Sequence, residues 1–421
     1  MIGRNDWPTA SIELYYRTII YYQLLQQETR VNVLMLVKQF TASVQIRWPA
    51  RSSGMFKPLP FIFVLSGVGC KLATTQTVSR DNMNNRQFSL EFPYTIAPPS
   101  ASALFRSVPE DFQVTEQLGF DLSGEGEHLC LYVEKRGQNT HWVAGLLAKY
   151  FGVDDMAVGH CGMKDRHAVT RQWFSVHLPG KLPESLEQPP VLEGCQVLAQ
   201  RRHPKKLRRG QHAGNQFVIR LRQIDGDVSA LEHSLQQVVN GVPNYFGEQR
   251  FGWAAGNLVE ANRLLSVWGD TPSNKKQNSG RRRQRSPIDG IYLSAARAYL
   301  FNLVLAERVR SGHWKLTMPG ETVPEGPLWG RGRSAAPQSV QLLEDQVLSS
   351  WADWTNSLEY SGLQQERRSL LLMPSNMQYR WLNCNDHTDL ELSFELPSGC
   401  FATSVLRELV TLRPICGNGA I

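Results

Sequence analysis

The chain has 421 residues, of which 42% are hydrophobic, and a formal net charge of +7. This length exceeds one ordinary core and predicts two domains, and the apolar content is enough to fill both. No apolar run is long enough to span a bilayer, and seven scattered cysteines without a Cys-x-x-Cys pair argue against structural zinc. We therefore expect a soluble, cytoplasmic protein without a membrane partner.

The first 90 residues differ from the remainder in composition and in hydrophobic pattern. They contain ten Lys and Arg against four Asp and Glu, and no sustained period. Their charge is like that of a transit peptide, but they lack an amphipathic Arg-rich face. We expect residues 1–90 to be an extension of doubtful structure, either an overlong start upstream of Met83 or a disordered arm.

From Phe105 onward the pattern is that of an α+β protein. Residues 112–116 and 129–133 alternate as strands do, with turn glycines between them. A helix is predicted after Asn139 or Thr140, because apolar residues follow at helical spacing from Val143 to Tyr150. Residues 156–160 and 169–178 then predict two further strands around a turn at Gly162.

The second half changes to a helical pattern and back. Residues 258–265 and 293–309 carry apolar side chains at helical spacing, and strand alternation returns at residues 390–396. A mainly helical module therefore lies between two strand-rich pieces. Two segments, residues 201–209 and 275–285, each contain six cations and are either phosphate-binding surfaces or merely solvated faces. The cluster at 201–209 is the stronger candidate for binding phosphate, because strand-like segments flank it.

The densest polar segment is residues 159–174, where Lys164, Asp165, Arg166 and His167 share one turn between predicted strands. Catalytic groups are often held on such loops. An aspartate in a turn also commonly accepts backbone N–H groups, which is a structural role. The residue pattern alone does not choose among these four side chains.

Residues 162–174, Gly-Met-Lys-Asp-Arg-His-Ala-Val-Thr-Arg-Gln-Trp-Phe, closely resemble the signature of the TruD family of tRNA pseudouridine synthases. Six other blocks resemble that family in the same order, and together they cover roughly residues 91–412: 109–116, 123–128, 206–217, 242–252, 293–297 and 401–407. Seven collinear blocks identify the chain as a member of this family.

The resemblance implies that the protein isomerises a uridine of tRNA, at position 13, to pseudouridine with Asp165 as the catalytic carboxylate. A carboxylate is needed because the detached uracil must turn while the anomeric centre of the sugar is stabilised. The carboxylate does this either by bonding to the sugar or by removing a proton from it to give a glycal. No redox or group-transfer step occurs, so we expect no metal and no cofactor.

The family pattern also implies substrate contacts at Phe112, Asn215 and Phe401. A flipped base is held by aromatic faces and read by an amide, which both donates and accepts. Phe217 and Lys164 are weaker candidates for substrate contacts. Phe217 fits a core position in its strand, and Lys164 either binds phosphate or orients Asp165. The histidines near the motif are interpreted as structural.

The implied fold is an α+β pseudouridine-synthase domain with a mixed or antiparallel sheet, formed by residues 91–240 and 388–421. It is interrupted by an inserted α+β TRUD domain at 241–387, with tRNA in the cleft between them and the protein acting as a monomer. The insertion looks shortened after Trp314, so we expect the helical faces of Leu300, Leu303 and Val304 to be exposed.

The sequence also bears on three other functions. An RNA-binding or RNA-folding protein of the same fold with weakened catalysis remains the alternative. A zinc deaminase would need His-x-Glu and Pro-Cys-x-x-Cys, which the sequence lacks. A glycosidase would need two carboxylates flanking a pocket, which a sequence does not reveal.

Overall fold

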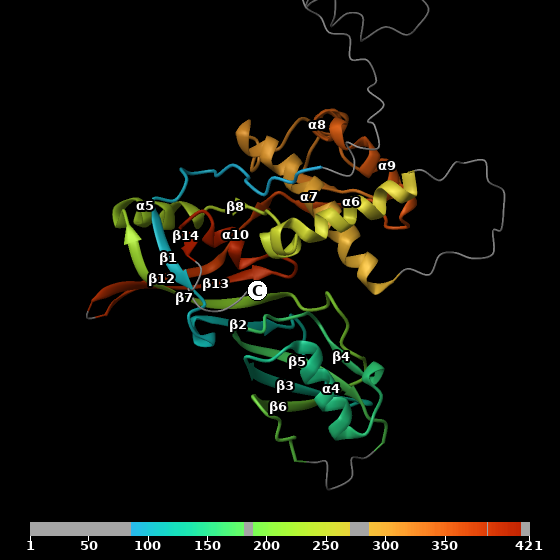
Figure 1. Cartoon of the computed structure of the whole chain (residues 1–421). Coiled ribbons are helices and arrows are strands. Elements are labelled where there is room, and N and C mark those ends of the chain that lie inside the picture. Colours follow the sequence, from blue (N-terminus) through green and yellow to red (C-terminus); the bar gives the residue numbers. More distant parts are fainter. Residues whose placement is uncertain (1–85, 181–187, 270–285, 385, 414–421) are drawn as a thin grey trace, which may run out of the picture. The chain divides into compact units, whose positions relative to one another are not determined.

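The structure is a computed structural model that describes residues 86–180, 188–269, 286–384 and 386–413 (Figure 1). The cationic cluster at 275–285 and most of the N-terminal extension lie outside these residues. Within the described ranges, no helix is long and apolar enough to cross a membrane. Strands and helices are both present throughout, which confirms the α+β class.

A ten-stranded mixed sheet carries the site. Its main path runs β12-β13-β7-β2-β5-β3-β6, with β1, β14 and β4 attached at its sides. The pairs β2–β5 and β1–β14 are parallel and the other pairs are antiparallel. The strands are β1 (Ala101–Phe105), β2 (Phe112–Gln117), β3 (His128–Arg136), β4 (Val158–His160), β5 (Val169–His177), β6 (Cys195–His203), β7 (Gly214–Gly226), β12 (Ser375–Cys384), β13 (His387–Pro397) and β14 (Thr411–Arg413).

The last strands join a sheet begun more than 200 residues earlier. β13 pairs with β7 along eight residues, and β12 pairs with β13. The expected boundary at residue 388 would assign β12 to the inserted domain, whereas its hydrogen bonds place it at the edge of the main sheet. The sequence does not predict β12 as a strand of this sheet, because an edge strand is exposed and the polar-rich β12 has no buried face to produce an alternating pattern.

Helices cover one face of this sheet. α4 (Thr140–Phe151) packs Val143 and Leu147 against Leu131 and Phe174 of the strands. α5 (Val228–Val238) and α10 (Ala402–Leu406) cover the apolar residues of β7 and β13 in a separate core, which includes Phe217. As predicted, Asn139 caps α4, its side chain accepting from the His141 amide.

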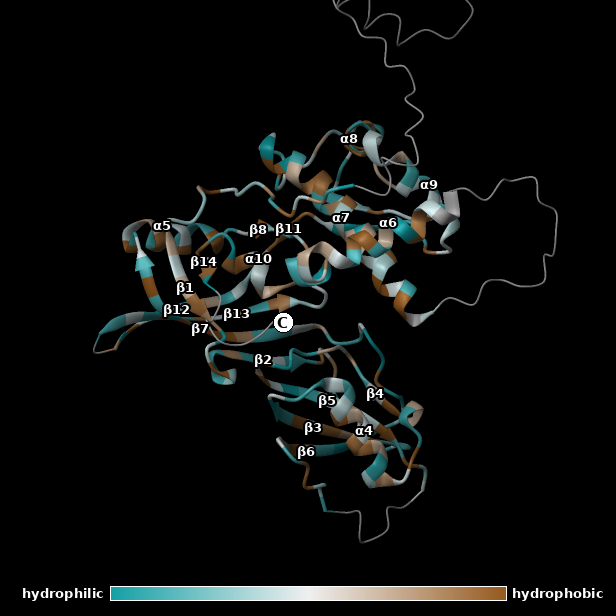
Figure 2. Ribbon diagram, in the orientation of Figure 1, coloured by the Kyte–Doolittle hydropathy of each residue, from teal (hydrophilic) through white to brown (hydrophobic). Residues whose placement is uncertain are grey.

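The helical module has its own core. It consists of α6 (Gly256–Gly269), α7 (Pro287–Arg310), α8 (Gln338–Leu348) and α9 (Ala352–Tyr360), the pair β9 (Glu325–Leu328) and β10 (Glu366–Ser369), the pair β8 (Val242–Pro243) and β11 (Leu371–Leu372), and the short 3-10 turns η4 (Glu248–Arg250), η5 (Trp253–Ala255) and η6 (Ser349–Trp351). Figure 2 shows brown, hydrophobic residues along α7, the helix at the centre of the module.

The expectation that α7 exposes apolar surface is wrong. Leu300 and Val304 are fully buried, and Leu303 packs against the same core. The segment at residues 86–92 supplies part of the cover, since Phe88 and Phe92 both contact the ring of Tyr299 on α7. The module therefore closes its core with side chains from outside its own sequence range.

Candidate active site

The turn that carries Asp165 lies between β4 and β5, and buried polar side chains hold its backbone through hydrogen bonds. The Lys164 amide donates to Thr140 Oγ1 at 3.0 Å, and Gln172 Nε2 donates to the Gly162 carbonyl at 3.1 Å. Lys135 Nζ donates to the carbonyl oxygen of Asp165 at 2.9 Å. Thr140, Gln172 and Lys135 are all fully buried. The backbone of the turn is therefore held on a rigid support.

The carboxylate of Asp165 is open to solvent on one side and paired on the other. Its Oδ2 lies 3.3 Å from Arg106 Nη2, and its side chain is 40% exposed. The Arg106 guanidinium also lies over the rings of Phe112, at 4.1 Å, and Phe105, at 4.8 Å. Burial lowers the pKa of Arg106, which the charge of Asp165 partly opposes.

Arg106 was not among the residues predicted from the sequence. Its φ of 61° lies in the left-handed region, which is unusual for an arginine. Strained residues of this kind cluster at functional sites. A cation six residues before Phe112 was the only available signal, and only the fold brings it to Asp165.

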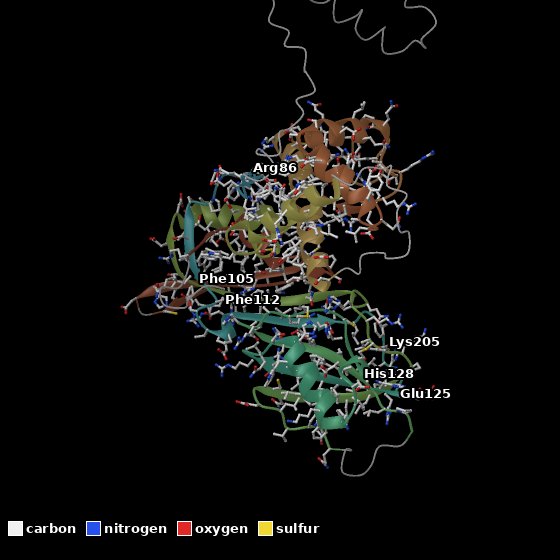
Figure 3. All side chains as sticks on the ribbon, turned by 45° about the vertical axis from the view of Figure 1, so that its right-hand side comes forward. Arg86, Phe105, Phe112, Glu125, His128 and Lys205 are labelled. Carbon is white, nitrogen blue, oxygen red and sulfur yellow. The ribbon has the colours of Figure 1, made fainter. Side chains whose placement is uncertain are left out.

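Phe112 is buried rather than open to a ligand. Its ring is 2% exposed and packs between Arg106 and Phe217, whose centroid lies 6.0 Å away. Figure 3 shows Phe112 beside Phe105, and the two rings meet edge to face. In this arrangement Phe112 supports the guanidinium that pairs with Asp165.

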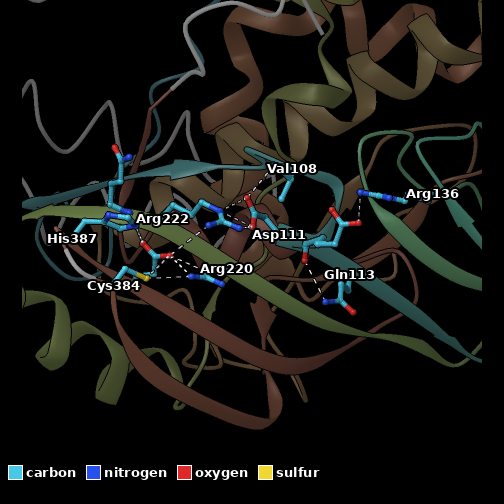
Figure 4. A network of polar contacts seen from close by, with 11 residues as sticks. Val108, Asp111, Gln113, Arg136, Arg220, Arg222, Cys384 and His387 are labelled. Carbon is cyan, nitrogen blue, oxygen red and sulfur yellow. Dashed lines mark hydrogen bonds and ion pairs between the residues drawn. The ribbon is translucent and has the colours of Figure 1, made fainter.

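A buried ionic network fixes the start of β2 and hence Phe112 (Figure 4). Asp111, in η1 (Pro109–Asp111), accepts from Arg222 at 2.7 Å and from the Val108 amide. Arg220 donates to Asp389 at 2.8 Å in the same network. Burial alone would raise the pKa of Asp389, but the Gln223 amide and Arg220 together lower it.

One possible metal-ligand group occurs in the described ranges. Donor atoms of Cys384, His387 and Asp389 lie within 4.8 Å of one another. The carboxylate of Asp389 is already balanced by Arg220 and by Arg222, whose Nη1 is 3.8 Å away. Two guanidinium groups at this distance repel a cation, so the group does not fit a metal site.

Lys164 and Glu116 form a buried ion pair beside Asp165. The Lys164 Nζ to Glu116 Oε2 distance is 2.8 Å, and both side chains are nearly inaccessible. The second oxygen of Glu116 accepts from the Trp173 amide at 3.1 Å. Lys164 thus links the turn that carries Asp165 to β2, and its ammonium is not presented to a phosphate.

Asn215 lies on β7 near the same turn and has an unused acceptor. Its Nδ2 is 3.5 Å from His212 Nε2, while its buried Oδ1 has no partner among the described residues. A Cβ added to Gly162 would lie 3.2 Å from the His212 ring and 3.4 Å from Lys164 Nζ. His212, which the sequence reading missed, therefore connects Asn215 to the turn.

Phe401 is connected to the residues around Asp165 indirectly, through the loop that precedes it. It precedes α10, and its ring centroid is 6.0 Å from that of Phe246 in the helical module. The loop before it is tied to the start of β7, because the Ser398 amide donates at 2.9 Å to the carbonyl of Ala213, the residue before that strand. Ser398 Oγ is also 3.3 Å from His212 Nε2. Phe401 is thus connected to Asn215 through this loop, and no direct contact with Asp165 occurs in the described structure.

The cationic cluster at 201–209 divides into two kinds of residue. Arg202 donates to the Leu178 and Gly180 carbonyls, and Lys206 donates to the Met156 carbonyl, so both support loops. Arg201, Lys205 and Arg208 are exposed and have no side-chain partner in the described ranges. Arg209 is also exposed, and its Nη2 lies 3.4 Å from His141 Nε2. The three exposed cations without a partner are the most available to a phosphate.

Lys135 gives the site a pH-dependent stability. Burial lowers its pKa to about 8 from 10.5, with Asp165 and Cys195 opposing the change. Between these values the unfolded chain binds the proton and the native chain does not, so the free energy of unfolding rises with pH across this window. Below about pH 8 both states are protonated and this contribution is constant.

We expect Lys135→Met to remove that rise. Urea denaturation at several pH values measures the difference in unfolding free energy between wild type and variant, in which other titrating groups cancel. Lys149→Met, an exposed lysine on α4, is the control and should run parallel to wild type. Parallel curves for Lys135→Met as well would show that its ammonium is not desolvated.

Comparisons with known proteins converge on one family. The model described as "tRNA pseudouridine synthase D (TruD)" matches residues 91–265. A protein named tRNA pseudouridine synthase D from Cellvibrio japonicus is 54% identical over 331 residues, covering 77% of this chain and 94% of its own length. A protein of the same name from Nitrosococcus oceani is 42% identical over 350 residues, covering 76% and 94%.

The fold has a solved counterpart. A crystal structure from Methanosarcina mazei, provisionally named tRNA pseudouridine synthase D, aligns with a TM-score of 0.55 and 20% identity. The alignment covers 76% of this chain and 95% of the other. At this identity the likeness shows a shared fold.

Proposed function

This chain belongs to the TruD family of tRNA pseudouridine synthases, and on that premise we propose that it isomerises the uridine at position 13 of tRNA with Asp165 as the catalytic carboxylate. The single observation that carries the assignment is the geometry of Asp165. Its backbone is held by buried side chains, its carboxylate pairs with Arg106, and 40% of its side chain remains exposed. A fixed, ionised and accessible carboxylate is what the reaction needs.

The reaction breaks the bond between the sugar C1′ and uracil N1 and forms a bond from C1′ to C5. The proton on C5 is lost and N1 gains one, so atoms and electrons balance within the nucleotide. Asp165 either bonds to C1′ or removes a sugar proton while the base turns. The isomerisation has no redox step and no donor group, so its chemistry calls for no cofactor.

The other proposed site residues have distinct roles. The free Oδ1 of Asn215 suits the N3–H of uracil, because a buried carbonyl oxygen without a partner is otherwise costly. Phe401 is proposed to stack on the flipped base. Phe112 is proposed to act through Arg106, whose guanidinium covers its ring. All these groups come from one chain, so the proposed active form is a monomer. The tRNA substrate favours a cytoplasmic location.

The test is direct mapping of the product. Unmodified tRNA transcripts with uridine at position 13 are incubated with the full-length protein, and pseudouridine is located by chemical labelling and primer extension. We expect conversion at position 13, and none in a transcript with cytidine there. Product at another position would contradict the assigned position. Tight binding without product would favour the alternative of an RNA-binding protein with weakened catalysis.

The exposed cations of the 201–209 cluster should contribute to tRNA affinity. Each lost phosphate contact lowers the slope of log affinity against log salt by ~0.7 to 0.9. Replacing Arg201, Lys205 and Arg208 by glutamine should therefore flatten the slope, as measured by filter binding at several salt concentrations. Arg202→Gln is the matched control, because it should reduce stability and leave the slope intact. The reverse pattern would contradict this division of the cluster.

A further inference from the structure

Two arginines of the helical module converge on one aromatic ring. The guanidinium carbons of Arg250, in η4, and Arg368, in β10, lie 5.6 Å and 4.3 Å from the ring centroid of Phe246. Both side chains are half-buried. The buried Nε of each has no hydrogen-bond partner in the described ranges.

Neither arginine has a carboxylate partner in the part of the chain that the structure describes. Arg368 donates to the Gly399 carbonyl at 3.0 Å and to Asn244 Oδ1 at 2.6 Å, which are both neutral. Burial lowers the pKa of both arginines. For Arg368 the Cys400 thiol opposes this shift, and the charge of Arg250 adds to it.

The neighbouring residue shows the usual arrangement. Arg367 pairs with the buried carboxylate of Glu344 at 2.6 Å. A pair of partly desolvated cations without a counter-ion is costly to maintain for stability alone. The arrangement of Arg250 and Arg368 is instead typical of a site that binds an anion.

The backbone after Arg250 is strained. Ala254 and Ala255 have φ values of 48° and 60°, in the region that favours glycine. Such strain persists where surrounding structure imposes it and is concentrated at binding sites. The loop that presents Arg250 is therefore held in one conformation rather than being a relaxed surface turn.

The arginine pair lies beside Phe401. Phe246, whose ring both guanidinium groups approach, is 6.0 Å from the Phe401 ring. The Gly399 carbonyl that Arg368 binds is two residues before Phe401. A nucleotide whose base stacks on Phe401 has a phosphate on each side of its sugar, and flipping the base brings that backbone to the protein surface.

We propose that Arg250 and Arg368 bind a phosphodiester of the tRNA backbone directly adjacent to the uridine that is isomerised. This rests on the proposed function, because it requires an RNA substrate. The free edge of Arg250 can engage two phosphate oxygens, and Arg368 adds N–H donors that its bonds to Gly399 and Asn244 leave unused. Phe246 keeps the guanidinium planes in place, and the phosphate supplies the missing negative charge.

Arg250→Gln in the full-length protein tests the contact through affinity for unmodified tRNA. At low salt we expect binding roughly 5- to 20-fold weaker, and a salt slope shallower by ~0.7 to 0.9. Arg250→Lys should keep the slope. Arg263→Gln, an exposed arginine on α6 that is paired with Glu260, is the matched control and should bind as wild type does. A purely structural role predicts instead a lower melting temperature with an unchanged slope, which would overturn the inference.

A chemical change in the RNA locates the phosphate. tRNAs are ligated with one neutral methylphosphonate on the 5′ or the 3′ side of the target uridine. We expect one of them to weaken binding to wild type and to have little further effect on Arg250→Gln. Independent, multiplying losses at both positions would overturn the assigned contact.

The outcomes separate this inference from the proposed function. Wild-type protein that binds tRNA but forms no pseudouridine would refute the function, while the affinity comparisons would still report on the arginines. An active wild type with an Arg250→Gln variant of equal affinity and slope would refute the phosphate contact alone.

Discussion

Replacing Asp165 by asparagine is expected to slow pseudouridine formation by at least about 1000-fold, equivalent to ~4 kcal/mol of transition-state stabilisation. Asparagine keeps the size of the side chain and can still accept from Arg106, but it has no charge with which to stabilise the anomeric centre or remove a proton. Single-turnover formation of pseudouridine in unmodified tRNA, with enzyme in excess, measures the chemical step.

Binding provides the control for this variant. The contacts that hold the turn use the backbone carbonyl of Asp165 and the side chains of Thr140 and Gln172, all of which the substitution leaves in place. We therefore expect tRNA affinity within a few-fold of wild type. Asp155→Asn, an exposed aspartate before β4, should be fully active. Near-normal turnover by Asp165→Asn would exclude this carboxylate as the catalytic group.

The second large effect is on stability. Lys164→Met removes one member of an ion pair in which Glu116 is fully buried. Leaving a buried charge without its partner costs about 3 to 5 kcal/mol. We expect a loss of that size in the free energy of unfolding, measured by urea denaturation at neutral pH.

A double-mutant cycle separates this penalty from a direct effect on folding. Adding Glu116→Gln to Lys164→Met removes the uncompensated charge while keeping an oxygen for the Trp173 amide, so most of the lost stability should return. The exposed pair Arg380–Glu391, with an N–O distance of 2.8 Å, is the comparison and should contribute less than about 1 kcal/mol. Additive losses in the Lys164–Glu116 cycle would mean that the two groups are not coupled.

Several features followed from the sequence because they depend on residues close together along the chain. The N-terminus of α4 is set by Asn139 and by the spacing of Val143 and Leu147. The strand alternation at residues 112–116 and 390–396 corresponds to β2 and β13. The α+β class, the helical module between strand-rich pieces and family membership rest on these local patterns and on collinear motif blocks.

The identity of the groups around Asp165 required the tertiary structure. Arg106 and Asp165 are 59 positions apart, and only the pairing of β2 with β5 brings their segments together. Asn215 approaches the Gly162 turn through His212, which no periodicity marks. Phe112 carries the motif of a base-contacting residue, yet the fold places Arg106 over its ring.

Which groups a given side chain contacts is likewise decided by the tertiary structure. Arg201 and Arg202 are neighbours in a single cationic run, but alternation along β6 leaves the first exposed and directs the second to the Leu178 carbonyl. The core that contains Leu300 and Val304 is covered in part by the segment with Phe88, which lies more than 200 positions earlier in the chain. A sequence determines local conformation through nearest-neighbour sterics and periodic burial, whereas which side chain neutralises or covers another depends on the long-range packing of elements already formed.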